Sequence, residues 1–138
     1  MKYFYVICPV SADPDFADKR AMLQELGTET GVAPFFPLER HSQFYIEAVS
    51  RDMKLAAFVV ADLSFERPSC YFELGVAEAV GATVFLVATT GTPIHQVGEP
   101  REIAWYEDTA GYRSIISGMI ASYSDVATGP LIGYHHKR

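Results

Sequence analysis

A single glutamate stands out among the residues that could carry chemistry in this chain of 138 residues. Glu73 lies in the apolar and aromatic stretch from Cys70 to Ala77, and the next charge along the chain is Glu78. A carboxylate in apolar surroundings can act as a nucleophile when a substrate reaches it. Glutamate is also common in the first turn of helices for simple electrostatic reasons, so a surface or capping role is the alternative.

Polar residues in two other segments could bind what Glu73 acts on. Asp62 directly follows a continuous apolar run and is either a second catalytic carboxylate or a cap for the loop behind it. Arg67, in that loop, either contacts a phosphate or carboxylate or remains a solvated charge. Near the N-terminus, Ser11 either meets a phosphate or hydrogen bonds within its own loop. We predict Glu73 and Asp62 as catalytic candidates, and the substrate-binding candidates are Cys8, Pro9, Ser11, Ser64, Arg67 and Ser69.

Apolar runs alternate with helix-period segments, which predicts five strands separated by helices. The expected strands are Tyr3–Cys8, Val32–Leu38, Ala56–Leu63, Thr83–Ala88 and Ile103–Tyr106. The expected helices run from an Asp13-Pro14 cap to about Glu29, from a cap at Ser42 with Phe44 or Tyr45, Ile46, Val49 and Met53 facing inward, from about Cys70 to Val80, and onward from Thr109. Pro34 and Pro37 predict that the second strand lies at an edge or is short and irregular.

Strands joined by crossover helices form parallel sheets with helices on both faces. We therefore predict an α/β flavodoxin-like three-layer sandwich with a five-stranded parallel sheet in the order 2-1-3-4-5. Ligands bind such sheets at the carboxyl ends of the strands where the order reverses, here between the first and third strands. The loops that follow these two strands, which hold Ser11 and Arg67, meet there beside Glu73. We expect Glu73 in the first turn of its helix, with its carboxylate ionised. One domain is expected over residues 1–126, followed by a flexible tail over 127–138.

Composition excludes several classes of protein. A net charge of −6 disfavours binding to nucleic acid polymers, which needs a basic face. The two cysteines form no CxxC motif and no Cys/His cluster, so we expect no disulfide scaffold, no metal and no cofactor. The first apolar run is too short for a signal peptide or a membrane span, so we expect a cytoplasmic protein without a membrane partner. The motifs GxGxxG, GxxxxGK[ST] and GxSxG are absent.

One segment carries a recognisable motif. An apolar run ends in Ala61-Asp62-Leu63-Ser64, a loop continues with Arg67-Pro68-Ser69, and the next helix carries Tyr71-Phe72-Glu73-Leu74-Gly75-Val76-Ala77. This sequence motif resembles that of the nucleoside 2-deoxyribosyltransferase-like superfamily, in which the segments AD(L/V)(S/T), NPN and YELG-x-A follow one another along the chain. The opening Phe4–Val10 is similar to the first strand of that superfamily and its proline-containing loop. Here Arg67-Pro68-Ser69 replaces NPN, and Phe72 replaces a tyrosine.

The resemblance implies an N-glycosidic-bond hydrolase or transferase that acts on a nucleoside, a nucleotide or a dinucleotide such as NAD. Glu73 would be the nucleophile that captures the anomeric carbon. The alternative is a non-catalytic nucleotide-sensing or protein-interaction domain, as in TIR-like relatives. Ala57 stands where transferases often have aspartate, and Arg67 stands where nucleotide hydrolases have serine, so the substrate stays open. The implied partners are small molecules, and a homo-oligomer is a further expectation.

Overall fold

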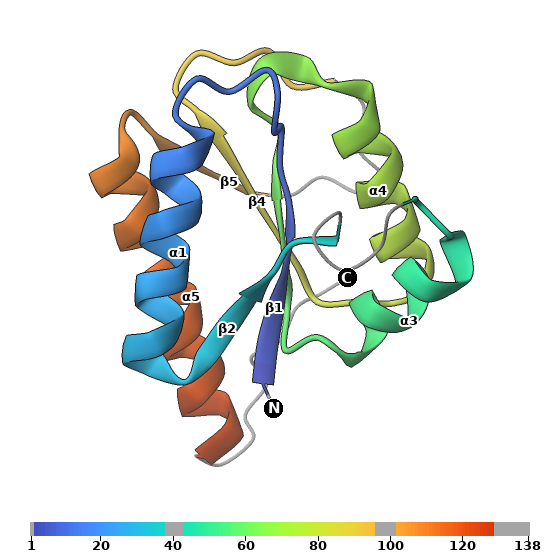
Figure 1. Cartoon of the computed structure of the whole chain (residues 1–138), viewed down its shortest axis with the longest axis vertical. Helices are drawn as coiled ribbons and strands as arrows, with labels where there is room; N and C mark the ends of the chain where they lie inside the picture. Colours follow the sequence, from blue (N-terminus) through green and yellow to red (C-terminus); the bar gives the residue numbers. More distant parts are fainter. Residues whose placement is uncertain (1, 38–42, 96–101, 129–138) are drawn as a thin grey trace.

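The computed structural model of the protein describes residues 2–37, 43–95 and 102–128 (Figure 1). A five-stranded, entirely parallel sheet in the order β2-β1-β3-β4-β5 forms its centre, which confirms the predicted class and strand order. The strands are β1 (Lys2–Ile7), β2 (Val32–Phe35), β3 (Val59–Asp62), β4 (Val84–Thr89) and β5 (Ile103–Tyr106). Within the described residues, the helices are α1 (Phe16–Thr30), α3 (Ile46–Leu55), α4 (Pro68–Ala79) and α5 (Thr109–Thr128), with a short 3₁₀ turn η1 (Ser64–Glu66).

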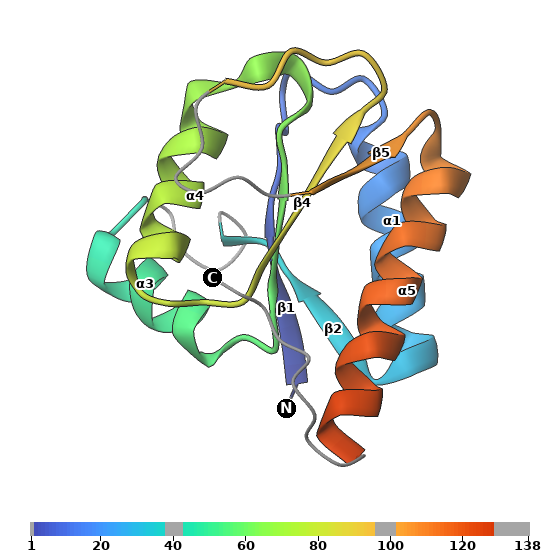
Figure 2. The same ribbon diagram turned by 180° about the vertical axis from the view of Figure 1, so that it is seen from behind.

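Helices cover both faces of the sheet. Helices α1 and α5 lie on one face, and α3 and α4 lie on the other (Figures 1 and 2). Alternate residues of β1 serve the two layers: Phe4 and Val6 pack on the α1–α5 side, and Tyr5 and Ile7 pack on the α3–α4 side. Because both faces are buried, the central strands read as continuous apolar runs in the sequence.

Helix α1 begins at Phe16, two residues after the predicted start at Pro14. The chain first forms a turn in which the Phe16 N–H donates to the Asp13 carbonyl at 3.2 Å. The Asp13 carboxylate accepts a hydrogen bond from the Asp15 N–H within this turn at 2.8 Å and pairs with the buried Lys19 at 2.6 Å. The predicted end is confirmed: Gly31 closes the helix with φ of 80°, in the left-handed region that favours glycine.

Helix α1 packs tightly on the edge strand β2 at one glycine. A Cβ atom at Gly27 would lie 2.9 Å from Cδ of Pro34 and 3.1 Å from Cα of Ala33. Only glycine therefore allows this approach. The edge position of β2 confirms what its prolines predicted.

Helix α3 shows a narrower inner face than predicted. Val49 and Met53 are each only 1% exposed, as expected. The expected inward residues before them are instead open to solvent: Phe44 is 37% exposed, Tyr45 52% and Ile46 49%. The helix begins only at Ile46, so the two aromatic residues precede it. Ser42, the predicted cap, lies outside the described residues.

Helix α4 begins at Pro68, two residues before the predicted start at Cys70. Proline suits the first helical position because its missing N–H has no partner there in any case. Glu73 consequently lies in the second turn, and the first turn holds no acidic residue. This placement removes most of the predicted influence of the helix dipole on its carboxylate.

Helix α5 reaches Thr128, so the first two residues of the predicted tail are helical. The rest of that tail, 129–138, lies outside the described residues. None of the described helices is both long and apolar enough to cross a bilayer. Within the same ranges, no three His, Cys, Asp or Glu side chains form a group that could hold a metal ion.

Candidate active site

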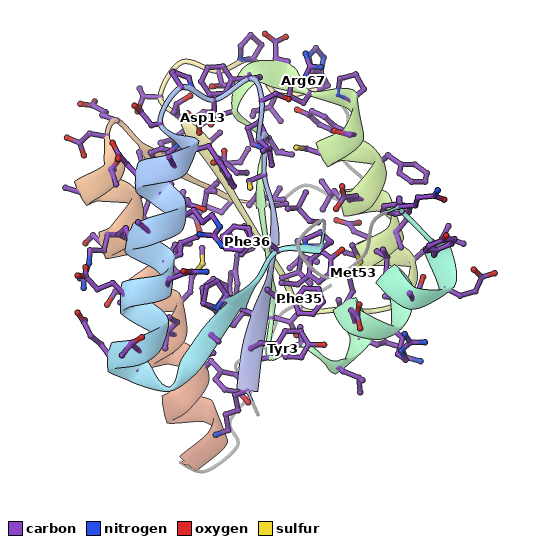
Figure 3. The ribbon with its side chains drawn as sticks, viewed as in Figure 1. Tyr3, Asp13, Phe35, Phe36, Met53 and Arg67 are labelled. Carbon is purple, nitrogen blue, oxygen red and sulfur yellow. The ribbon has the colours of Figure 1, made fainter. Side chains whose placement is uncertain are left out.

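A cavity of about 470 Å³ opens at the carboxyl ends of the strands, beside the point where the strand order reverses. Asp13 and Arg67 mark this end of the molecule in Figure 3. Among the predicted site residues, the cavity is lined by Cys8, Pro9, Ser11, Arg67, Ser69 and Glu73. Asp62 and Ser64 do not line it. The remaining lining residues are Val10, Ala12, Pro37, Gln43, Phe44, Val49 and Phe72.

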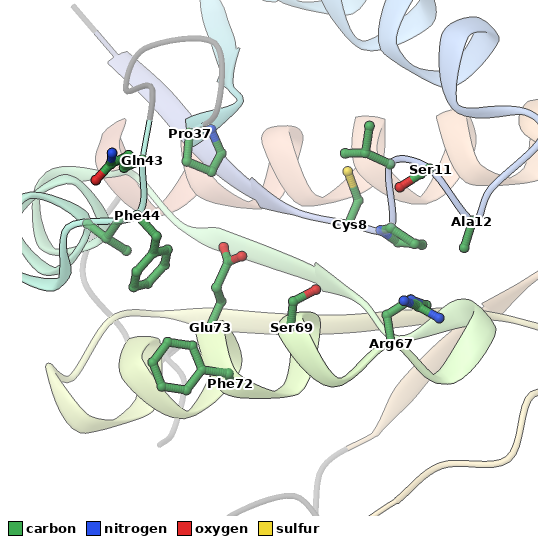
Figure 4. A pocket seen from close by; sticks show the side chains of 13 residues that line it. Cys8, Ser11, Ala12, Pro37, Gln43, Phe44, Arg67, Ser69, Phe72 and Glu73 are labelled. Atoms are coloured by element: carbon green, nitrogen blue, oxygen red, sulfur yellow. The ribbon is translucent and has the colours of Figure 1, made fainter.

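Glu73 projects from α4 into the middle of this cavity (Figure 4). Its Oε1 atom is buried and has no hydrogen-bond partner among the described residues. Burial raises the pKa of Glu73 from 4.5 to about 7. Burial thus opposes the expected ionised form, because desolvation outweighs the weak dipole effect in the second helical turn. Buried polar atoms normally have partners, so an oxygen that faces a cavity and has no protein partner among the described residues is available to a ligand.

One side of the cavity is suited to an anion. Ser69 lies in the first turn of α4, and Arg67 directly precedes the helix. Both lie on one side of Glu73, opposite the loop that holds Ser11 and Ala12 (Figure 4). Arg67 is the only cationic side chain among the described residues that line the cavity. A guanidinium beside the first turn of a helix is a favourable place for a phosphate.

The turn that delivers Arg67 to the cavity is conformationally strained. Phe65 and Glu66 have φ angles of 67° and 51°, which non-glycine residues rarely adopt. Contacts hold this turn in place. Glu66 Oε1 lies 2.8 Å from His95 Nε2, and the backbone N–H of His95 donates to the Tyr71 hydroxyl at 3.0 Å.

Aromatic side chains form the other side of the cavity. Phe44 and Phe72 lie on the opposite side of Glu73 from Arg67 (Figure 4). Their ring centroids are 5.4 Å apart, with planes tilted by 57°. Phe72 is 56% exposed, so this pair forms a partly open rim.

The hydroxyl of Tyr5 is a second buried group without a partner in the described part of the chain. Burial raises the pKa of Tyr5, and the charge of Glu73 raises it further. The sequence analysis missed this residue. The signal was present, because strand alternation places Tyr5 with Ile7 on the sheet face that α4 covers.

Asp62 belongs to a buried polar network next to the cavity. Its Oδ2 atom accepts a hydrogen bond from the Tyr106 hydroxyl at 2.6 Å, and its Oδ1 atom accepts one from the Ser64 N–H at 3.0 Å. The Ser64 hydroxyl accepts a bond from the Thr89 N–H at 2.8 Å. Burial raises the pKa of Asp62, against the opposing effect of the hydrogen bonds from Tyr106 and Ser64.

Lys19 is the cation of this network and is only 6% exposed. Its Nζ atom donates to the Tyr106 hydroxyl at 2.7 Å and to Asp13 Oδ2 at 2.6 Å, and it lies 4.0 Å from Asp62 Oδ2. It also lies 4.7 Å from the centre of the Tyr106 ring. The signal in the sequence was a lysine at helical spacing from Phe16 and Leu23, on the apolar face of α1.

The thiols near the cavity are poor candidates for nucleophiles. Burial raises the pKa of Cys8, and the charges of Asp62 and Glu73 add to the effect. Burial likewise raises the pKa of Cys70 to about 12. The thiolate is the reactive form of cysteine, and both side chains stay protonated near neutral pH.

Comparison with known proteins finds similar structures but no match by sequence. No protein-family model matches the chain, and no curated protein matches it. A 2-deoxyribosyltransferase from Leishmania mexicana superposes with a TM-score of 0.51 at 22% identity, over 64% of this chain and 65% of that one, just under two thirds of its length.

Two further solved structures cover more of the chain. A 2-deoxyribosyltransferase from Bacillus psychrosaccharolyticus has a TM-score of 0.58 and 15% identity, over 86% of this chain and 95% of that one. A CMP N-glycosidase from Clostridium botulinum has a TM-score of 0.60 and 13% identity, over 83% of this chain and 98% of that one. At such identities the likeness establishes a shared fold, the one that the Glu73 motif implied.

Proposed function

We propose that the protein cleaves or transfers the N-glycosidic bond of a nucleoside phosphate, with Glu73 as the nucleophile. One observation carries the proposal: the Glu73 carboxylate, one oxygen of which is buried without a partner among the described residues, projects into a cavity of about 470 Å³ at the carboxyl ends of the strands. The fold shared with two deoxyribosyltransferases and a CMP N-glycosidase supports the same chemistry.

In the proposed reaction, a carboxylate oxygen of Glu73 attacks the anomeric carbon while the bond from that carbon to the base nitrogen breaks. The base leaves with the bonding electron pair, and the sugar remains as an ester of Glu73. A pyrimidine or purine takes up a proton from water as it leaves, whereas the positively charged nicotinamide of NAD leaves as a neutral ring without one. Water, or a second base, then attacks the same carbon, releases a proton and restores the carboxylate. Positive charge develops on the sugar in both transition states and favours the ionised form of Glu73.

Tyr5 is the proposed positioning residue for this carboxylate, because its hydroxyl is buried without a partner among the described residues on the face of the sheet that α4 covers. Tyr5→Phe is expected to lower kcat by about 10-fold to 100-fold with little change in KM. Stability should not fall, because the lost hydroxyl has no partner among the described residues of the unliganded protein. Base-release kinetics and thermal unfolding measure the two effects.

Tyr3→Phe is the matched control on the same strand. The Tyr3 hydroxyl donates to the Asp52 carbonyl at 2.6 Å, so its loss should destabilise the fold by about 1 kcal/mol and leave kcat unchanged. If Tyr5→Phe showed the same pattern as Tyr3→Phe, Tyr5 would be structural and the positioning role would be wrong.

Arg67 is the proposed phosphate contact. Arg67→Ala is expected to raise KM for a nucleoside 5′-phosphate by about 10-fold to 100-fold, because a charge-assisted hydrogen bond is lost. The unphosphorylated nucleoside should be affected little. The control is Arg113→Ala, which removes an arginine that pairs with Glu29 at 2.9 Å instead of lining the cavity. An equal rise in KM for both substrates would contradict the phosphate contact.

The proposal is tested by incubating the protein with deoxynucleosides, nucleoside monophosphates and NAD, and by measuring free base by chromatography. Base release from at least one of these compounds is expected. Binding of nucleotides without any release would instead favour the alternative of a nucleotide-sensing domain.

A further inference from the structure

A second, smaller cavity of about 140 Å³ adjoins the main one. Four residues line both cavities: Cys8, Val10, Pro37 and Glu73. The smaller cavity adds Val6, Phe16 and Phe36, which lie towards α1. Glu73 therefore stands where the two cavities meet.

The small cavity is apolar and aromatic. Among its described lining side chains, the only polar groups are the Glu73 carboxylate and the Cys8 thiol. Phe16 and Phe36 contact each other edge to face, with centroids 6.0 Å apart and planes at 89°. The Arg20 guanidinium lies 5.9 Å from the centre of the Phe36 ring and supports it from outside the cavity.

The volume of the cavity limits what can occupy it. In another protein, an engineered apolar cavity of about 150 Å³ stays dry and binds benzene. A cavity of about 140 Å³ thus suits one six-membered ring. The fused two-ring system of a purine needs more space, and protein interiors yield little because they are close-packed.

We infer that the small cavity receives the base of the substrate and selects a single six-membered heterocycle, a pyrimidine or nicotinamide, over a bicyclic purine. This inference rests on the proposed function. With the ring of the base against Phe16 and Phe36, the sugar lies at Glu73 and the phosphate extends through the larger cavity towards Arg67. Phe16 and Phe36 are then the residues that determine specificity.

Binding to the Glu73→Gln protein tests the size selection without turnover. The ligands are CMP, UMP and nicotinamide mononucleotide against AMP and GMP, which all carry a ribose 5′-phosphate. At least one single-ring nucleotide is expected to bind at least about 10-fold tighter than either purine nucleotide. The tightest of the three distinguishes a pyrimidine from nicotinamide. Purine nucleotides that bind equally well or better overturn the inference.

Phe16→Ala, made in the same Glu73→Gln background, tests the assignment to this cavity. Enlarging it should bring purine and single-ring affinities to within about 3-fold of each other. Phe72→Ala is the matched control, because Phe72 lines only the larger cavity of the two and should leave the ratio unchanged. An unchanged ratio in a folded Phe16→Ala protein overturns the assignment. The comparison of ligands in the parent protein decides the size selection even if Phe16→Ala does not fold.

The inference and the proposed function fail in different ways. Selective binding of single-ring nucleotides with no base release by the wild type contradicts the proposed function but still supports the small cavity as the binding site of the base. Release of purine and pyrimidine bases at equal rates contradicts the size selection but still supports cleavage of the N-glycosidic bond. No binding of any nucleotide contradicts both.

Discussion

Glu73→Gln is expected to reduce base release by at least about 1,000-fold and to make the protein more stable at neutral and alkaline pH. Glutamine has nearly the shape of glutamate but cannot form the glycosyl ester, so the loss should appear in kcat. For the wild type, activity should rise as the pH increases through about 7, where the Glu73 carboxyl ionises. A variant that retains the wild-type rate would show that Glu73 is not the nucleophile.

The stability effect follows from the direction of the pKa shift. Burial raises the pKa of Glu73 from 4.5 to about 7 in the folded protein, so between these values the folded state binds more protons than the unfolded state. The wild type therefore loses stability as the pH rises through this range, and the full penalty is present above pH 7. Glutamine carries no such penalty. Its advantage should be absent below pH 4.5 and reach at most about 3 kcal/mol above pH 7.

Urea unfolding of both proteins at pH 4 and pH 8 measures this difference directly. Glu25→Gln is the matched control, because it makes the same change at an exposed position of α1. It should alter neither the rate nor the pH dependence of the free energy of unfolding. If Glu73→Gln raised the free energy of unfolding equally at pH 4 and pH 8, the burial of a protonated carboxyl at Glu73 would be contradicted.

Lys19→Met should destabilise the fold by about 3–5 kcal/mol, the largest stability loss that we expect from one substitution outside the cavity lining. Methionine fills a similar volume but leaves the carboxylates of Asp13 and Asp62 buried without their shared cation. The Tyr106 hydroxyl also loses the donor that lies 2.7 Å from it.

Chemical unfolding measures this loss, and Lys54→Met serves as the control at an exposed position of α3. That change should fall within about 0.5 kcal/mol of the wild type. Adding Asp62→Asn to Lys19→Met should recover part of the loss, because it removes one unpaired charge. A loss below about 1 kcal/mol for Lys19→Met alone would contradict a stabilising role for this ion pair.

The same rule for proline at a helix start gave opposite outcomes at two positions. At Pro68 the helix does begin with the proline, as the rule requires, although the sequence analysis placed the start later. At Pro14 the rule predicts a helix start that the structure moves to Phe16. At Pro14 the chain first makes a turn, closed by a hydrogen bond from the Phe16 N–H to the Asp13 carbonyl, and one oxygen of the Asp13 carboxylate pairs with the buried Lys19.

The sheet order and the position of the cleft were predictable because they depend on local patterns. Apolar runs and their helical connections fix the strands, and the reversal of strand order fixes where loops converge. The network around Asp62 was not predictable in this way. Lys19 and Tyr106 are far apart in sequence, and their contact exists only once β5 lies beside β4 and α1 covers the same face.

The predicted site residues likewise divide into features set by local patterns and features set by tertiary packing. Cys8, Ser11 and Glu73 reach the cavity because strand ends and a helix start place them there. The raised pKa of Glu73 was not predicted, because desolvation depends on what packs around the side chain and a sequence window does not contain that information.

Pro34 on β2 has a consequence for how copies of this protein behave towards one another. A proline can pair within a sheet only where its nitrogen faces away from the neighbouring strand, and here that side is the free edge of the sheet. The edge therefore lacks one amide donor that a strand from another molecule would need. This works against edge-to-edge aggregation along β2, the strand that lies beside β1 and that leads to Pro37 in the lining of the cavity.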